Sequence, residues 1–299
     1  MQKLIKEYIK LAKMDLKASK SSYEHNLYPQ AVFFFSQSVE KANKALALFS
    51  GKYTEQDMLD IGHDPTKIYQ NLIIEQRLKS KRTLQRLVEA PELSELYSLS
   101  GISTDLMEES IEECESQLKE IGSLQKAKFS PTFLSANEIQ IILRDLERID
   151  SDLLEPLKEL PSFSLSKEEW EALTNKIIEW AEGLDQIDDK ALLEIKNELH
   201  SSNVDIEELT NVIRKVLLQL FELSRIAAPL YILSSIATRH SIIARYPDTI
   251  RYTKEMYPTK IYTRKLPLVR YLNDLIELHF RTVDLLDEYC SKYGSSSKT

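Results

Sequence analysis

The stretch Ala31–Phe49, AVFFFSQSVEKANKALALF, repeats apolar residues at helical spacing. Its seam, with a residue every three or four positions, consists of Val32, Phe35, Val39, Ala42, Leu46 and Phe49. This spacing puts the seam residues on one face of an α-helix, so we expect that face to be buried. Pro29 suits the first turn of the helix, and Gly51 is a stop signal after it. The polar residues within the same stretch need a separate explanation.

Similar rows occur at both ends of the chain. The first helix carries Ile5, Ile9, Ala12 and Leu16, and the last carries Leu268, Leu272, Leu275, His279, Val283 and Leu286. Amphipathic segments also fill the region from about residue 75 to residue 220, with expected N-caps at Ser103 or Thr104, Ser135, Ser166 and Asn203. Alternating strand-like runs are rare, and the 299 residues include only six glycines. The sequence therefore predicts an all-α fold.

The composition limits the classes of function. The formal net charge is −8, so any contact with nucleic acid must come from a local basic patch. The only two cysteines, Cys114 and Cys290, lie too far apart for a CxxC motif, which argues against a disulfide framework. We find no apolar run long enough to span a bilayer and no signal peptide, and we expect a cytoplasmic protein.

A longer motif joins the polar residues of Ala31–Phe49 to a histidine. DLKASKSSYEHNLYPQAVFFFSQSVEKANKALALFSGK is followed after a loop by His63-Asp64, and ARYPD occupies Ala244–Asp248. These segments resemble the HEPN domain family, whose second helix has the form A-x-F-x-x-x-Q-x-x-E-K-x-x-K-A-L and precedes a histidine at the start of the third. The matching residues are Asp15, Ala31, Phe33, Gln37, Glu40, Lys41, Lys44, Ala45 and His63.

The resemblance implies a HEPN-like, up-and-down helical bundle built from residues 1–75 and 222–292. Residues 76–221 would then form a central helical insertion, and residues 293–299 a flexible tail. Such an insertion is compatible with a bundle, because loops on the surface join its helices.

The resemblance also implies a nucleotide or RNA groove where the second helix meets ARYPD. Lys41, Lys44, His63, Arg245 and Asp248 are its candidate lining residues. Other interpretations remain open for each of them. Glu40 and Lys44 have the spacing of an ion pair on a solvated helix face. The alternative for Arg245 and Asp248 is that they pair with each other within a compact turn. Gln37 is expected to be a buried hydrogen-bonding side chain.

His63 has three possible roles from sequence: a base, a phosphate ligand, or part of a helix start. Asp64 is expected to cap the helix that Pro65 begins. HEPN ribonucleases use an Arg-x4-6-His motif, and no histidine of this chain has an arginine at that distance before it. The alternative of a divergent ribonuclease would combine Arg245 or Arg239 with His63 or His240.

The function expected from these features is noncatalytic binding of a nucleotide, RNA or a protein partner. The alternatives are a ribonuclease or toxin component of a toxin–antitoxin pair, and a purely structural scaffold. The resemblance implies a homodimer and a minimal nucleotidyltransferase partner. We expect no cofactor and no metal, because the usual metal and nucleotide-loop motifs are missing. RYTKEMYPTKIYTRK, over residues 251–265, could bind a single strand or form a Tyr-rich flap on the bundle.

Overall fold

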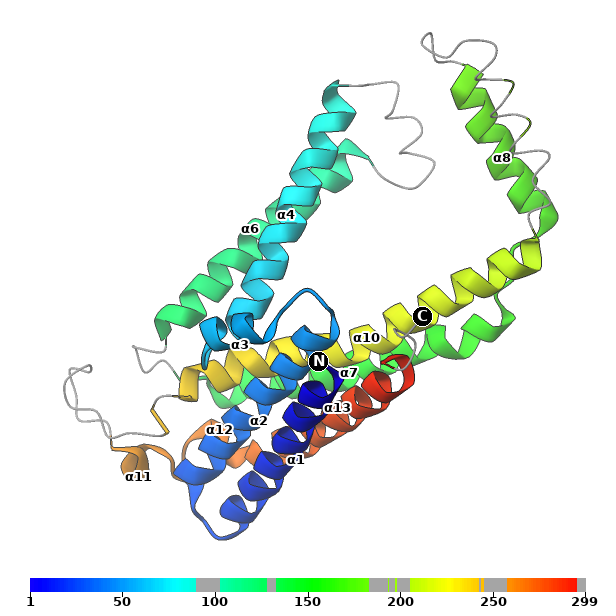
Figure 1. The fold of residues 1–299 in the computed structure, drawn as a ribbon. Helices are drawn as coiled ribbons and strands as arrows, with labels where there is room; N and C mark the ends of the chain where they lie inside the picture. Colours follow the sequence, from blue (N-terminus) through cyan, green and yellow to red (C-terminus); the bar gives the residue numbers. More distant parts are fainter. Residues whose placement is uncertain are drawn as a thin grey trace. The chain divides into compact units, whose positions relative to one another are not determined.

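Helices joined by loops make up the part of the chain that the computed structural model describes (Figure 1). The described residues are 1–89, 103–127, 133–182, 193, 197, 205–241, 243–244 and 257–294. The helices are α1 (Gln2–Glu24), α2 (Tyr28–Phe49), α3 (Glu55–Ile61), α4 (Thr66–Glu89), α6 (Thr104–Ala127), α7 (Ala136–Glu159), η1 (Leu160–Ser162), α8 (Lys167–Glu182), α10 (Ile206–His240), α11 (Pro258–Ile261), α12 (Pro267–Arg270) and α13 (Leu272–Tyr293). No strand occurs among these residues, and the all-α prediction is confirmed.

The chain divides into two compact units. The first unit contains residues 1–72, 118–155 and 221–299, and the second contains residues 73–117 and 156–220. The two ends of the chain therefore share one unit. Residues 118–155 belong to it as well, although the division made from the sequence assigned them to the insertion.

The core of the first unit lies between α1, α2, α10 and α13. The predicted rows of α1 and α13 are buried throughout, including His279. In α2 the first four seam residues are buried, whereas Leu46 and Phe49 are only partly buried. α1 and α2 form a helical hairpin, and α13 packs against both of them. The hairpin ends at Gly51, whose φ of 70° favours glycine.

Two buried polar networks connect these helices. In one, Ser38 of α2 donates to the carbonyl oxygen of Ala12 in α1 at 2.8 Å, and Nε2 of His279 lies 3.1 Å from the Ser38 hydroxyl. In the other, Asn43 Nδ2 donates to Ser234 Oγ of α10 at 2.9 Å, and the Tyr69 hydroxyl of α4 donates to Asn43 Oδ1. Polar side chains of α2 thus hold its neighbours in a fixed register, because buried polar groups need partners.

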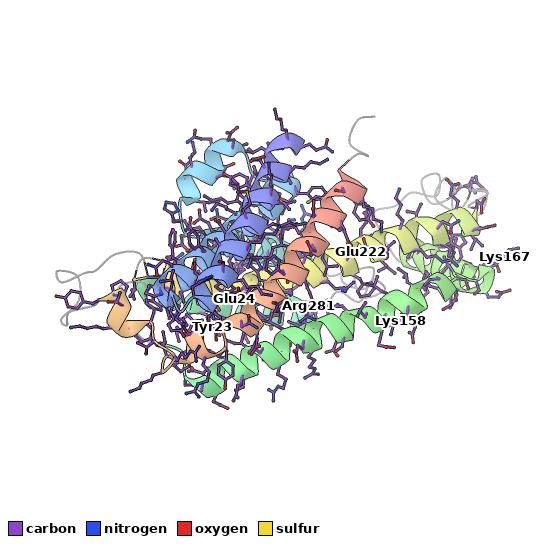
Figure 2. The ribbon with its side chains drawn as sticks, turned by 90° about the horizontal axis from the view of Figure 1, so that it is seen from below. Tyr23, Glu24, Lys158, Lys167, Glu222 and Arg281 are labelled. Atoms are coloured by element: carbon purple, nitrogen blue, oxygen red, sulfur yellow. The ribbon has the colours of Figure 1, made fainter. Side chains whose placement is uncertain are left out.

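The C-terminal turn of α13 is tied to α10. Glu222, labelled in Figure 2, lies on α10. It accepts hydrogen bonds from Lys292 Nζ at 2.8 Å and from the Tyr293 hydroxyl at 2.9 Å. Gly294, which follows α13, accepts a hydrogen bond from the Gln2 side chain of α1. Both ends of the chain are therefore bound to the same bundle.

Serine caps begin three of the described helices. Ser103, Ser135 and Ser166 accept backbone N–H bonds from residues of the first turn of α6, α7 and α8, as predicted. Asn203 lies outside the described residues, and Asp205 caps α10 by accepting from the N–H groups of Glu207 and Glu208. Such caps satisfy donors that have no partner inside the helix.

The length and apolar character of α10 differ from what the sequence led us to expect. Within the described part of the chain, its segment Ile206–Thr238 is long and apolar enough to cross a membrane, judged by length and composition alone. The expectation that no apolar run has this length was therefore wrong. In the first unit the helix buries Ile226, Leu230, Leu233 and Ile236 in the core, where an apolar helix is also required.

Candidate functional site

A carboxylate buried on α2 is the centre of the candidate site. Glu40 is only 6% exposed. Its oxygens lie 3.0 Å from Lys44 Nζ, 3.1 Å from His63 Nδ1 and 3.5 Å from Gln37 Nε2. Gln37, Glu40 and Lys44 occupy one face of the helix, because residues three and four positions apart are neighbours. Glu40 and Lys44 are thus explained by a buried ion pair, whereas Gln37, which was expected to be buried, is only partly buried.

The ion pair of Glu40 and Lys44 forms as the spacing suggested, but it is not on a solvated face. The two side chains are 8% and 9% exposed. The sequence of α2 could not show this burial, since the covering residues come from other segments. Removing one member of a buried pair leaves an uncompensated charge, which typically costs about 3–5 kcal/mol. Glu40 and Lys44 therefore stabilise each other.

Lys41 points to α1. Its ammonium donates to the carboxylate of Asp15, and the two side chains are 22% and 18% exposed. Both lysines of the predicted groove thus already contact a carboxylate. Asp15 was identified from sequence only as a residue that matched a family motif, and its role as the partner of Lys41 becomes visible only when α1 and α2 are packed together.

His63 lies in the loop between α3 and α4, not at the start of a helix as the resemblance implied. The preceding Gly62 has a φ of 62°, a conformation that glycine allows. The His63 side chain is 67% exposed, and only its Nδ1 faces Glu40. Because a carboxylate can only accept, Nδ1 carries a hydrogen. Nε2 is left for a solute, as an acceptor in the neutral ring and as a donor in the imidazolium.

Asp64 caps α4. Its Oδ1 accepts from the Thr66 backbone N–H at 3.2 Å and from the Thr66 hydroxyl at 2.5 Å. The predicted cap is present, and the helix begins at Thr66 rather than at Pro65. This cap fixes the loop that carries His63.

His240 is a core residue. It is 1% exposed, its ring stacks on Phe133 with an interplanar angle of 13°, and its Nδ1 lies 3.0 Å from the Tyr262 hydroxyl. Arg245 and Asp248 lie outside the described residues, as does the side chain of Arg239. The structure thus places Lys44 and His63 on Glu40, and Lys41 on Asp15.

The described end of the Tyr-rich segment is held on the bundle. Tyr262 is 1% exposed, and Arg264 donates to the Tyr28 hydroxyl at 2.5 Å. Tyr257 stacks beneath the Lys260 ammonium at 4.8 Å. These contacts fit the flap interpretation, while residues 251–256 lie outside the described part.

Tyr8 is a residue of this region that the sequence did not reveal. Burial raises the pKa of the Tyr8 hydroxyl, and the negative charges of Glu40 and Glu55 raise that pKa further. Tyr8 therefore remains protonated and keeps its hydrogen-bond donor. In the sequence it only widened the apolar row of the first helix, so no signal distinguished it.

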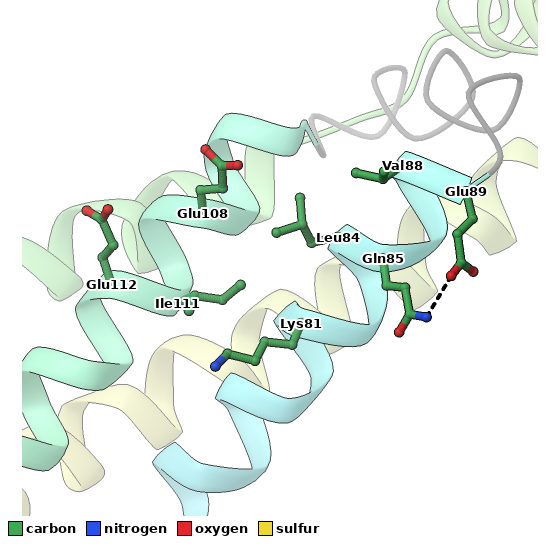
Figure 3. Close-up of a pocket in the computed structure, with 8 residues that line it drawn as sticks. All are labelled: Lys81, Leu84, Gln85, Val88, Glu89, Glu108, Ile111 and Glu112. Atoms are coloured by element: carbon green, nitrogen blue, oxygen red, sulfur yellow. Dashed lines mark hydrogen bonds between the residues drawn. The ribbon is translucent and has the colours of Figure 1, made fainter.

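A cavity of about 530 Å³ lies elsewhere, between α4 and α6 in the second unit (Figure 3). Leu84, Val88 and Ile111 form its apolar floor, and charged side chains such as Lys81 and Glu108 border it. None of the predicted site residues lines this cavity. Among the described residues, no group of three or more His, Cys, Asp or Glu side chains could hold a metal ion.

Comparison with protein families gives one match. Residues 5–127 match the HEPN domain. The matched range includes α6 and the part of α4 after residue 75, which the division made from the sequence placed in the insertion, and does not include residues 222–292. Comparisons with curated proteins and with solved structures find no match. A HEPN domain indicates a function related to nucleotides or RNA. Over residues 5–127, the chain is therefore similar to the HEPN domain family.

Proposed function

We propose that the first unit binds a phosphate group of a nucleotide or of RNA at His63 and does not cleave it. The observation that carries this proposal is the geometry of His63. Its side chain is exposed, and the buried carboxylate of Glu40 holds Nδ1 at 3.1 Å. A ring fixed in this way presents Nε2 in one direction, so little side-chain entropy is lost when a ligand binds. In the imidazolium form both ring nitrogens carry a hydrogen, so Nδ1 donates to Glu40 while Nε2 donates to a phosphate oxygen.

In this proposal the two lysines do not bind the phosphate directly, and their role is to neutralise nearby carboxylates. Lys41 and Lys44 are balanced by Asp15 and Glu40, so the cluster without the imidazole is close to neutral. The site therefore has no excess negative charge that would repel a phosphate group. The groove suggested by the resemblance, with Arg245 and Asp248 beside these lysines, belongs to the same proposal.

Binding without cleavage is favoured by the small number of available imidazoles. Cleavage of RNA needs proton transfer at both the attacking and the leaving oxygen, together with stabilisation of the phosphate charge. His240 and His279 are buried in the core of the first unit. His25, which is exposed, contacts the carbonyl oxygen of Ser21 at the end of α1. In the described part of this unit, His63 is thus the single imidazole of the Glu40 cluster.

A divergent ribonuclease or toxin component is the second candidate. The pairing of His63 with Glu40 favours it, because a carboxylate that orients an imidazole is a common arrangement for a general base. This candidate requires an arginine such as Arg245, or a second subunit, to complete the site. A homodimer, a minimal nucleotidyltransferase partner and a cytoplasmic location remain proposals that accompany either function.

The binding proposal is tested with His63→Ala and, as a matched control, His25→Ala. Binding of fluorescent ATP and of a labelled RNA dodecamer is measured by anisotropy. Loss of a hydrogen bond to a charged group costs about 1.5–3 kcal/mol, so His63→Ala should weaken binding about tenfold or more. His25→Ala should bind as the wild type does, and equal binding by all three proteins would contradict the proposal.

Lysine variants need care in the same experiment. Lys44→Ala would leave the buried Glu40 carboxylate without its ion-pair partner and would destabilise the bundle. Lys41→Gln is the better variant, since Asp15 and Lys41 are both partly exposed. Thermal unfolding of each variant should accompany the binding curves.

A further inference from the structure

Six lysines of α1 follow one regular spacing. They are Lys3, Lys6, Lys10, Lys13, Lys17 and Lys20, separated alternately by three and four positions. A period of three and a half residues keeps all six on one side of a helix. The side of α1 that is buried in the core carries Ile5, Ile9, Ala12 and Leu16, so the lysines cover the surface away from the core.

Two of the six have partners on α13. Lys13 Nζ lies 2.8 Å from Asp284 and 2.7 Å from Asp287. Lys20 Nζ lies 2.5 Å from Glu277. These contacts are explained by the packing of α1 against α13 and need no ligand.

The other four lysines have no such explanation. Lys3, Lys6, Lys10 and Lys17 are exposed, and none forms an ion pair with another described residue. Lys3 and Lys17 are 14 positions apart, which corresponds to about 21 Å along a helix. We call these four residues the α1 lysine row. The exposed Glu7 lies on the same side, between Lys3 and Lys10, so these five residues carry four positive charges and one negative charge in a chain whose net charge is −8.

We propose that the α1 lysine row binds the phosphate backbone of an RNA strand. Its length of about 21 Å exceeds that of a mononucleotide and corresponds to about six phosphates at about 3.4 Å per nucleotide of a helical strand. A linear array of ammonium groups binds such a backbone electrostatically, independent of base sequence. The acidic residues Glu277, Asp284 and Asp287 of α13 border the row and confine a polyanion to α1.

A membrane surface fits these residues less well. Peripheral membrane helices insert an apolar face beside their basic one, whereas the apolar face of α1 is buried in the bundle core. Met14 is the large exposed hydrophobic residue next to the row. Because α1 exposes lysines but no apolar face, a nucleic-acid backbone is the better ligand for this surface than a membrane.

The surface is separate from the His63 site. Asp15, which contacts Lys41 of α2, is five positions from Lys10, so the two side chains point about 140° apart around the helix axis. Binding at the row does not require the phosphate contact proposed for His63, and the two proposals can fail separately.

The test compares two variants with the same change in net charge. The first changes Lys3, Lys6, Lys10 and Lys17 to Gln. The control changes four exposed lysines elsewhere to Gln: Lys119, Lys176, Lys215 and Lys265. A fluorescein-labelled, mixed-sequence RNA of 20 nucleotides is titrated with each protein at several salt concentrations, and vesicles of phosphatidylcholine with phosphatidylserine serve as the second probe.

We expect the row variant to bind RNA at least tenfold more weakly at low salt than the control does. Its slope of log K against log salt should be smaller by about 2.8, since each lost phosphate contact contributes about 0.7 for a single strand. Changing the same four lysines to Arg should retain binding, which excludes misfolding as the cause. Equal binding by the two Gln variants, no RNA binding by the wild type, or binding only to the vesicles would each overturn the proposal.

The His63→Ala variant shows whether a failure concerns the His63 proposal or the α1 lysine row proposal. If it loses binding of ATP but retains the salt slope for RNA, the His63 site and the row act independently. If the row variant binds RNA as the control does while His63→Ala does not, the row proposal fails and the His63 proposal stands.

Discussion

At the scale of single residues, His279 illustrates how burial determines protonation. Burial lowers its pKa to about 3, against a smaller opposite effect of its contact with Ser38. The Ser38 hydroxyl donates to Ala12, so Nε2 of His279 must donate to that hydroxyl, and the ring is neutral. Nδ1 has no hydrogen-bond partner among the described residues, which a neutral ring tolerates as a lone pair.

The lowered pKa of His279 predicts a loss of stability in acid. In the unfolded chain a histidine binds a proton below about pH 6.5, whereas the native His279 does so only near pH 3. The free energy of unfolding should therefore fall as the pH drops from about 6.5 towards 3, by up to about 1.4 kcal/mol per pH unit. Above pH 6.5 this residue contributes no pH dependence.

Urea unfolding at pH 7.5 and pH 5 tests this prediction. His279→Leu should show a smaller difference between the two pH values than the wild type does. His25→Gln is the control, since His25 is exposed. A pH dependence that is the same in wild type and His279→Leu would show that His279 is not the titrating group.

At the scale of elements, α2 connects the helices of the first unit through its polar side chains. Asn43 lies between Ser234 of α10 and the Tyr69 hydroxyl of α4, and it also bonds to the Val39 carbonyl in its own helix. Burial raises the pKa of Tyr69, so its hydroxyl stays protonated and requires an acceptor. Asn43 supplies it.

Replacing Asn43 should therefore be costly. Asn43→Leu leaves the Tyr69 hydroxyl without its acceptor in the core, and an unsatisfied buried group costs about 1–3 kcal/mol. We expect a loss of this size in the free energy of unfolding. Ser36→Ala is the control. Among the described residues the Ser36 hydroxyl bonds only to the Val32 carbonyl in the same helix, so its loss should be small. Similar losses in both variants would argue against the interhelical role of Asn43.

The helices themselves could be predicted from the sequence, since their rows and caps are local signals. The row Ile5, Ile9, Ala12 and Leu16 is buried, and Ser135 caps α7 as its position suggested. The surroundings of the site could not be predicted in the same way. Whether Glu40 faces solvent depends on His63, which is 23 positions away, and the partner of Lys41 is on another helix. Such contacts follow from packing, which no local pattern encodes.

At the scale of the whole molecule, the first unit requires both ends of the chain. α13 buries ten residues, among them Leu275 and Val283, and packs against α1 and α2. A protein truncated after residue 271 should lose the cooperative thermal transition of this unit, because α1 and α2 lose the apolar surface that covers them. Circular dichroism during heating measures this. Removal of residues 295–299 alone is the control, and an unchanged transition in the longer truncation would contradict the prediction.

The central claim, that His63 binds a phosphate group without cleaving RNA, is tested most directly by following the RNA itself. A mixed RNA pool is incubated with wild type, His63→Ala and His240→Ala in the presence of a chelator, and its lengths are determined by mass spectrometry. We predict intact RNA with all three proteins, together with binding that His63→Ala weakens and His240→Ala leaves unchanged where that protein folds. Shortened RNA with the wild type, absent with His63→Ala, would contradict the account and establish a ribonuclease.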